Sequence, residues 1–153
     1  GTSHFSYRDN NISVYKSFTH QHLGEIKKTL SAMNGSEIPE INFVPMRGDF
    51  PRGIFASLYT ECSIEDSEKV ANLYKEYYKD SPFVHYSDNG ISLKEVINTN
   101  KCLIHTELHN GKIHITSIID NLIKGASGQA VENMNLMFGL DQKRGLSLKP
   151  STF

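Results

Sequence analysis

The sequence predicts an α+β fold around a mixed or antiparallel β-sheet. Helical and strand-like segments alternate without the regular β-α-β order of a parallel sheet. The clearest hairpin signal is Asn110-Gly111, which separates two runs of alternating hydrophobicity. Neither a Gly-x-Gly-x-x-Gly fingerprint nor a P-loop occurs, so these residues are not expected to contain a nucleotide-binding half.

Length and composition set limits on the function. The 153 residues fit one domain, residues 1–153, and are enough to bury a sizeable core. The net charge is −1, with 16 basic and 17 acidic residues well mixed, so neither nucleic acid nor an anionic membrane is an expected partner. No apolar run approaches the roughly 18 residues of a spanning helix. Two cysteines make no disulfide scaffold, which favours a reducing, cytoplasmic location.

The first third of the chain predicts strand, helix and strand. Residues 12–16 alternate and are typical of a short strand. Apolar residues at spacings of three and four predict a helix from about Leu23 to residues 32–34, with Gly35 as its stop. Residues 41–44 predict a second strand that Pro45 ends.

The middle of the chain predicts strand, helix and strand again. Residues 54–61 alternate strongly. Residues 63–79 predict a helix with an apolar stripe, for which Ser63 and Ser67 are the candidate caps. Residues 83–86 predict a short strand, and residues 93–97 a single helical turn.

The hairpin of residues 101–119 has a predicted register and two distinct faces. A two-residue type I′ turn pairs His109 with Lys112, Glu107 with His114 and His105 with Thr116. The core face then carries Cys102, Ile104, Leu108, Ile113, Ile115 and Ile119. The other face carries His105, Glu107, His109 and His114, which is typical of a polar face in water or against a partner and, with lower weight, of a metal site.

The last predicted helix follows a turn at residues 120–128. Ser127 is the candidate N-cap, and Gly139 is the expected stop. Small residues at the start of this helix would let another backbone or a flat ligand approach closely.

The strongest chemical motif is His20-x-His22-x-x-Glu25. It lies where the predicted helix begins, and the positive end of a helix dipole disfavours imidazolium. A histidine so placed can be neutral near pH 7 and act as a general base. The alternatives are surface or capping histidines, which are common, and a zinc site, which is disfavoured because no cysteine lies nearby.

The loop of residues 46–53 is a second candidate site. It contains Arg47 and Arg52 among two glycines and a proline. Guanidinium groups match carboxylate and phosphate oxygens, so the loop can form an anion clamp. An ordinary loop with solvated arginines is an equally weighted alternative.

Three segments together resemble the C-terminal part of the N-acetyl-γ-glutamyl-phosphate reductase family. The most specific is residues 119–139, IDNLIKGASGQAVENMNLMFG, which resembles the family's terminal signature almost throughout. Residues 20–26 resemble its His-Arg-His-x-Pro-Glu-Ile motif, with Gln21 and Gly24 as departures. Val44-Pro45-Met46 and Arg52-Gly53-Ile54 resemble two further elements, and the resemblance extends over about residues 4–146.

One departure bears on the substrate. The loop between Met46 and Arg52 is longer than the family's commonest form. It is similar to the loop of related reductases that act on carrier-linked aminoadipyl phosphate in lysine biosynthesis. The aminoadipyl phosphate is therefore the alternative substrate.

The resemblance implies a fold and a reaction. The family joins a nucleotide-binding Rossmann domain to a glyceraldehyde-3-phosphate-dehydrogenase-like C-terminal domain, with helices on one face of its sheet. The reaction is the NADPH-dependent reduction of N-acetyl-glutamyl 5-phosphate to the 5-semialdehyde in arginine biosynthesis, through a cysteine thioester. Neither Cys62 nor Cys102 falls at the position of the family's catalytic cysteine. The chain is thus expected to be the catalytic and dimerisation domain without its NADP-binding domain, and to be inactive alone.

The resemblance also implies site residues. His20, and next His22, would be the acid–base residue. Substrate contacts would come from Tyr15, Glu25 and Arg52, and contacts to NADP from Asn121, Lys124 and Gly125. The chain would form a homodimer or homotetramer, with the polar hairpin face at or near the interface. A non-catalytic interaction module with the same fold is the alternative outside the enzymes.

Overall fold

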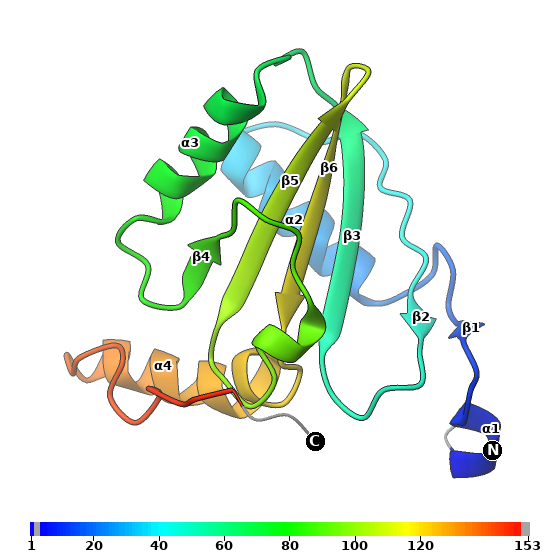
Figure 1. Cartoon of the computed structure of the whole chain (residues 1–153), viewed down its shortest axis with the longest axis vertical. Coiled ribbons are helices and arrows are strands. Elements are labelled where there is room, and N and C mark those ends of the chain that lie inside the picture. Colours follow the sequence, from blue (N-terminus) through cyan, green and yellow to red (C-terminus); the bar gives the residue numbers. More distant parts are fainter. Residues whose placement is uncertain (2–3, 151–153) are drawn as a thin grey trace. The chain divides into compact units, whose positions relative to one another are not determined.

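The computed structural model describes residue 1 and residues 4–150. The chain divides into two compact units, Gly1–Pro51 and Arg52–Phe153 (Figure 1). The single domain expected over residues 1–153 stays a prediction. Over the residues that the structure describes, no helix is long and apolar enough to cross a membrane.

The first unit contains one short helix, two short strands and one longer helix. Its elements are α1 (Phe5–Arg8), β1 (Ser13–Val14), α2 (His22–Asn34) and β2 (Met46–Arg47). The β1 and β2 strands pair antiparallel, with Ser13 opposite Arg47 and Val14 opposite Met46. The predicted central helix is confirmed as α2, and Gly35 ends it in the left-handed conformation at φ 70°.

The strand predicted over residues 41–44 does not form. Pro45 has no N–H to donate to a neighbouring strand. Two isolated hydrogen bonds to carbonyl groups stand in place of a ladder. Phe43 O accepts from Phe18 N at 2.9 Å, and Pro45 O accepts from Tyr15 N at 3.1 Å. Regular pairing begins only after the proline, at Met46, so the strand is β2 instead.

The second unit is built on a four-stranded sheet in the order β3-β6-β5-β4. The strands are β3 (Ile54–Glu61), β4 (Val84–Tyr86), β5 (Cys102–His109) and β6 (Lys112–Ile119). The β6 strand pairs antiparallel with β3 and β5, whereas β4 pairs parallel with β5. The prediction of a mixed sheet is therefore confirmed.

The predicted hairpin and its register are confirmed. Asn110 and Gly111 have φ values of 47° and 75°, and a type I′ turn requires both to be positive. His109 lies opposite Lys112, Glu107 opposite His114, and His105 opposite Thr116. The turn chemistry alone was therefore enough to assign every side chain of β5 and β6 to its face.

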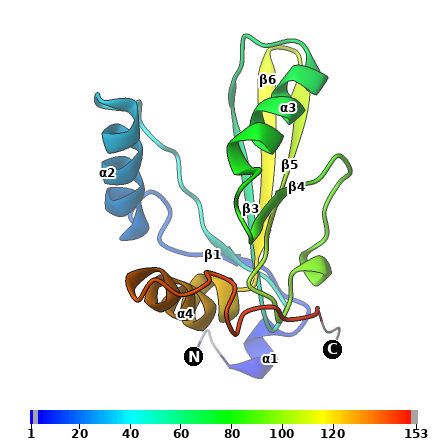
Figure 2. The same cartoon turned by 90° about the vertical axis from the view of Figure 1, so that its left-hand side faces the viewer.

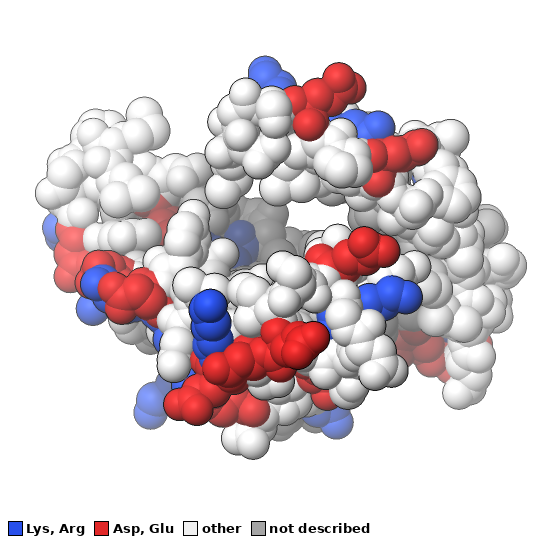
Figure 3. Space-filling view, turned by 90° about the horizontal axis from the view of Figure 1, so that it is seen from above, with Lys and Arg blue, Asp and Glu red and all other residues white. Residues whose placement is uncertain are grey.

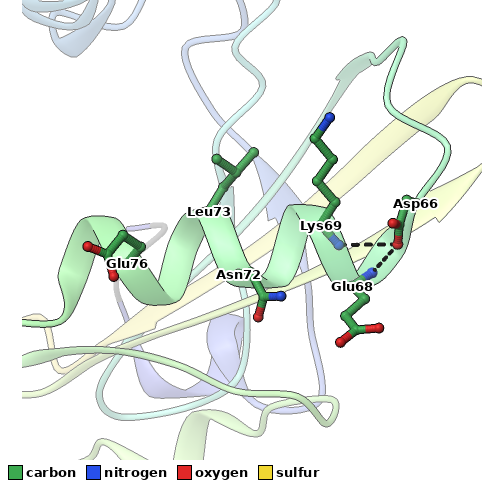
Figure 4. Close-up of a pocket in the computed structure, with 6 residues that line it drawn as sticks. All are labelled: Asp66, Glu68, Lys69, Asn72, Leu73 and Glu76. Atoms are coloured by element: carbon green, nitrogen blue, oxygen red, sulfur yellow. Dashed lines mark hydrogen bonds between the residues drawn. The ribbon is translucent and has the colours of Figure 1, made fainter.

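Helix α3 (Ser67–Tyr78) packs against β4 and β5. The ring of Tyr74 lies 5.9 Å from that of Tyr86 on β4, centre to centre. The helix is capped by Asp66 and not by Ser63 or Ser67, because the Asp66 carboxylate accepts from the N–H groups of Glu68 and Lys69 (Figure 4). A shorter 3₁₀ turn, η1 (Leu93–Glu95), occupies the place of the predicted helical turn.

The core of this unit lies on both faces of the hairpin. Ile104 and Ile113 are buried on the predicted core face. Ile118 and Thr116 belong to the opposite face and are buried as well, so that face is also covered near the end of β6. By contrast, β3 is an edge strand whose Phe55 and Tyr59 are exposed.

The signature segment after β6 forms a π-helical turn and then a helix. The turn η2 covers Ile123–Ser127 and the helix α4 covers Gly128–Met137. Figures 1 and 2 show α4 beyond the end of the sheet where β6 stops. Ser127 is not the predicted cap, because its hydroxyl donates to Leu122 O at 2.7 Å.

Candidate functional site

The chain enters the His20 site through a strained turn. Lys16 and Phe18 adopt left-handed backbone conformations, with φ values of 47° and 57°. Each such residue costs about 1–2 kcal/mol when it is not glycine. Strained residues of this kind concentrate at functional sites, where the surrounding structure holds them in place. Here they redirect the chain from β1 to the start of α2.

His20 lies among aromatic rings. Its ring centre is 5.6 Å from those of Tyr15 and Phe43, and both contacts are edge-on. The ring of His22 is nearer still, at 4.5 Å. Tyr15 follows β1 and Phe43 precedes β2, so the pairing of these two strands brings the rings to the histidine. The resemblance of the sequence predicts Tyr15 at this site, whereas no sequence signal marks Phe43.

The surroundings of His20 favour its neutral form. Partial burial, first of all, lowers its pKa from the ordinary 6.5, and the neighbouring charges of His22 and Lys16 lower it further. Glu25 acts in the opposite direction and raises the pKa. His20 Nδ1 accepts a hydrogen bond from His22 N at 3.3 Å, so in the neutral ring Nε2 carries the proton. His20 therefore presents a proton donor at Nε2 and is neutral at pH 7.

His22 and Glu25 occupy the first turn of α2. His22 is the first helical residue and is exposed, as is Glu25. A carboxylate in a first turn is favoured by the helix dipole. The prediction that the motif sits at a helix N-terminus is therefore confirmed, and the Glu25 charge is close enough to His20 to affect its pKa.

A cation completes this site. The guanidinium carbon of Arg47 lies 4.2 Å from the centre of the Tyr15 ring, which is the range of a cation–π contact. The sequence had identified Arg47 only as one of two arginines in a loop. Its position over Tyr15 depends on the β1–β2 pairing, and nothing in the local pattern predicts that pairing.

Arg52 lies in the second unit, in a buried ion pair. Its guanidinium donates to Asp120 at 3.0 Å and also to the side-chain oxygen of Asn98. Asp120 is fully buried and accepts three backbone N–H groups, those of Asn98, Leu122 and Ile123, at 2.7–2.8 Å. Burial raises the pKa of Asp120, but these donors outweigh it and hold the pKa below its ordinary value.

This carboxylate positions the signature segment. It binds the first two N–H groups after Asn121 and so fixes the entry into η2. Asn121 Oδ1 accepts from Gly53 N at 2.6 Å, and this contact fixes the orientation of the Asn121 amide. Gly125 N donates to Asp120 O at 2.9 Å. Arg52, Asn121 and Gly125 are thus brought together around Asp120, which sequence analysis missed.

Lys124 is held by a second buried carboxylate. Its ammonium donates to Glu132 at 2.7 Å, and Glu132 also accepts from the amides of Asn100 and Gln142. Burial raises the pKa of Glu132, while these three hydrogen bonds lower it, and the net direction is down. Lys124 therefore has an internal partner, and its contact with a cofactor stays a prediction.

The polar face of the hairpin carries a hydrogen-bonded row. His114 Nε2 lies 2.9 Å from Ser57 Oγ, and His114 Nδ1 lies 3.4 Å from the Glu107 carboxylate. His105 instead contacts Ser87 O at 2.9 Å. Among the described residues, no group of three His, Cys, Asp or Glu side chains is arranged to hold a metal ion.

Two other features give no reactive centre. Burial raises the pKa of the Cys102 thiol, although a hydrogen bond to Ser117 and the charge of Lys124 oppose this, so the thiol is not activated. The surface hollow in Figure 4 follows one side of α3, and its lining residues belong to neither cluster. Figure 3 shows acidic and basic side chains interspersed over the face that it presents.

The predicted site residues thus form two groups. His20, His22, Tyr15 and Glu25 share the first unit, where Phe43 and Arg47 join them. Arg52, Asn121, Lys124 and Gly125 share the second unit, where the buried carboxylates Asp120 and Glu132 organise them.

Comparison with curated proteins gives relatives that are more than half identical to this chain. The chain is 57% identical over 152 residues to an N-acetyl-gamma-glutamyl-phosphate reductase of Phocaeicola vulgatus, covering 99% of this chain and 47% of that protein. Proteins of the same name from Bacteroides thetaiotaomicron and Flavobacterium johnsoniae are 58% and 55% identical over similar spans. The chain therefore spans about half the length of the relatives that it matches.

Comparison of structures confirms the fold. The chain superposes on aspartate semialdehyde dehydrogenase II of Vibrio cholerae, solved in complex with ASA, with a TM-score of 0.58 and 15% identity. The match covers 78% of this chain and 37% of that one. The family model for the semialdehyde dehydrogenase dimerisation domain matches residues 1–121. The α+β fold, the identity with the reductases and this match together show that the chain belongs to the semialdehyde dehydrogenase dimerisation-domain family.

Proposed function

We propose that this chain is the acid–base and dimerisation part of an N-acetyl-γ-glutamyl-phosphate reductase of arginine biosynthesis, working in the cytoplasm. The reaction is the NADPH-dependent reduction of N-acetyl-glutamyl 5-phosphate to N-acetylglutamate 5-semialdehyde. The observation that carries the proposal is the 57% identity with a reductase of that name over 99% of the chain. The match includes both clusters of candidate site residues.

His20 is the proposed acid–base residue, and His22 is the second candidate for this role. In such a reaction a thiolate from outside this chain attacks the acyl carbon, phosphate leaves, and a thioester forms. A neutral imidazole can take the thiol proton beforehand. The imidazolium that results can then give that proton to the oxygen of the thioester carbonyl as that group is reduced. The lowered pKa of His20 supports the first step, because it keeps the imidazole neutral and able to take a proton.

The proposed substrate contacts differ in how the structure supports them. Tyr15 touches the His20 ring, and Glu25 lies in the first turn of α2, so both accompany the proposed acid–base residue. Arg52 is held by Asp120, so its support for the reaction is indirect: it helps to fix the Asp120–Asn121 segment.

NADPH would supply the hydride. Among the site residues of the second unit, Asn121 offers a group that fits this cofactor. Because Asn121 Oδ1 accepts from Gly53 N, its Nδ2 is a preoriented donor that suits an amide carbonyl such as that of nicotinamide. Gly125 lies beside it without a side chain, and Lys124 is held in place by Glu132. We infer that Asn121, Lys124 and Gly125 face the cofactor, and that most of its binding comes from residues outside this chain.

Assembly into a homodimer or homotetramer is part of the proposal. The family is named for dimerisation, and β3 exposes Phe55 and Tyr59 next to the Ser57–His114–Glu107 row. We infer that this face, with His105, lies at or near the interface. Light scattering on the complete protein tests this, because His114→Asn should weaken assembly, and unchanged assembly with lost turnover would count against it.

The same experiment distinguishes this function from two alternatives. The long loop before Arg52 favours the aminoadipyl phosphate substrate of lysine biosynthesis, whereas the relatives reported above are named for the acetylglutamyl substrate. A non-catalytic interaction module would keep the fold and the dimer but would not need a neutral His20.

The experiment uses the complete protein that contains this chain. Phosphate-dependent oxidation of N-acetylglutamate semialdehyde is followed through the formation of NADPH. We expect turnover by the wild type, and a loss of roughly 10²–10⁴-fold in kcat for His20→Asn with little change in KM. His4→Asn is the matched control, because His4 is an exposed histidine of the same unit whose capping role asparagine retains.

Three outcomes separate the readings. Activity on the aminoadipyl analogue alone would favour lysine biosynthesis. A raised KM with unchanged kcat in His20→Asn would make His20 a binding residue. No activity on either substrate, in a protein that still assembles, would favour the interaction module.

A further inference from the structure

Arg47 extends the His20 site by one side chain. Its guanidinium carbon lies 4.2 Å above the Tyr15 ring, whose centre lies 5.6 Å from that of His20. The β1–β2 ladder fixes the backbone, because Arg47 pairs with Ser13 two residues before Tyr15. Arg47, Tyr15 and His20 therefore form one row within the first unit.

The Arg47 guanidinium has no carboxylate partner among the residues that the structure describes. Asp49, two residues further along the chain, accepts from Asn10 N at 2.8 Å instead. Arg47 is exposed, and its hydrogen bond with Arg8 uses only its main-chain oxygen, at 3.4 Å. A stacked guanidinium keeps its N–H groups at the rim of the ring, where they can reach an oxyanion.

Beside Arg47, one further cation and one carboxylate lie near His20. Lys16 is close enough to lower the pKa of His20, and Glu25 is the opposing charge. An acyl phosphate with an α-carboxylate carries an anion at each end. Two oxygens on one centre match the fork of an arginine better than the point charge of a lysine.

We propose that Arg47 binds an oxyanion of the substrate beside His20, either its α-carboxylate or its phosphoryl group. This proposal rests on the proposed function, because it takes the substrate from there. Arg47 is then a binding residue, and Tyr15 is the platform that orients it. The second arginine of the loop, Arg52, cannot substitute for it while it is paired with Asp120.

The test measures the two anions separately in the complete protein. In the oxidative direction the semialdehyde carries the carboxylate and inorganic phosphate supplies the phosphoryl group. We expect Arg47→Gln to raise one of these two KM values about tenfold or more, with a smaller change in kcat. Arg47→Lys should recover only part of the loss. Lys27→Gln, an exposed cation on α2, is the matched control.

The outcomes of the kinetic test identify the anion or overturn the proposal. A raised KM for the semialdehyde assigns Arg47 to the carboxylate, and a raised KM for phosphate assigns it to the phosphoryl group. Unchanged values for both would refute an anion-binding role.

A second readout does not need turnover. Calorimetry with N-acetylglutamate and with inorganic phosphate compares binding to the wild type and to Arg47→Gln. If the wild type proves inactive, the proposed function fails, but weaker binding of either anion to the variant still supports the Arg47 site. Equal binding by both proteins overturns it.

Discussion

Arg47 and Arg52 come from one loop and have opposite surroundings. Arg47 is exposed and stacks on Tyr15, without a carboxylate partner in the described structure. Arg52 is part of a buried ion pair with Asp120, and only 23% of its side chain is exposed. The same side chain is thus available for a ligand in one place and committed to the fold in the other.

The contrast extends to the two clusters as wholes. Around His20, the polar groups are exposed or half-buried, and two residues other than glycine hold left-handed conformations. Around Asp120 and Glu132, the carboxylates are buried and each accepts three or more hydrogen bonds. A buried, fully paired carboxylate stabilises a unique conformation, whereas an exposed cation over a ring can exchange water for substrate. Local sequence therefore does not decide the role of a charged residue; the partner that the fold places opposite it does.

The largest expected effect follows from breaking the buried pair. Arg52→Gln leaves Asp120 without its cation but with its three backbone donors. We expect this to cost about 2 kcal/mol, which is in the range for a hydrogen bond to a charged group. Such a loss lowers the melting temperature of a unit of this size by roughly 8–16 °C. Hydrogen exchange in the complete protein should show the loss of protection in residues 118–127.

Arg47→Gln is the matched comparison. We expect it to change stability by no more than about 0.5 kcal/mol, as exposed substitutions usually do. If both variants lost the same protection, the distinction between a committed and an available arginine would be wrong.

Two glycines give a second comparison between the units, with a smaller effect. A Cβ on Gly128 would lie 2.3 Å from Asn100 Oδ1 and 2.8 Å from the backbone oxygen of Ile123. Asn100 is buried and donates to Glu132, so it cannot move without breaking that bond. We expect Gly128→Ala to destabilise the second unit by about 1–2 kcal/mol.

Gly24 in α2 is the control for this substitution. A Cβ there meets nothing within 4 Å, so alanine should stabilise the helix by up to about 1 kcal/mol. Thermal melts of the complete protein measure both variants. Equal shifts in the same direction would contradict the packing around Gly128.

The elements that sequence predicted well are those whose cause is local. The hairpin follows from Asn110-Gly111, where both residues need positive φ, and α2 follows from its apolar spacing and its glycine stop. The position of His20 just before α2 follows from the same local pattern.

The features that sequence missed depend on distant partners. Arg52 meets Asp120 across 68 positions, and Arg47 reaches Tyr15 only because β2 pairs with β1. The π-helical turn η2 forms where Asp120 binds the N–H groups of Leu122 and Ile123, and no propensity of the individual residues predicts it.

The smallest expected effect is a shift in the pH profile, and it concerns the exposed cluster alone. The proton-accepting form of His20 predominates above its pKa, which lies below 6.5, so the acid limb of kcat/KM for the oxidation should lie below pH 6.5. Lys16 lowers this pKa, so Lys16→Gln should move the limb to higher pH. Glu25 raises it, so Glu25→Gln should move the limb to lower pH. If the acid limb moved in the same direction in both variants, the group that titrates would not be an imidazole between these two charges.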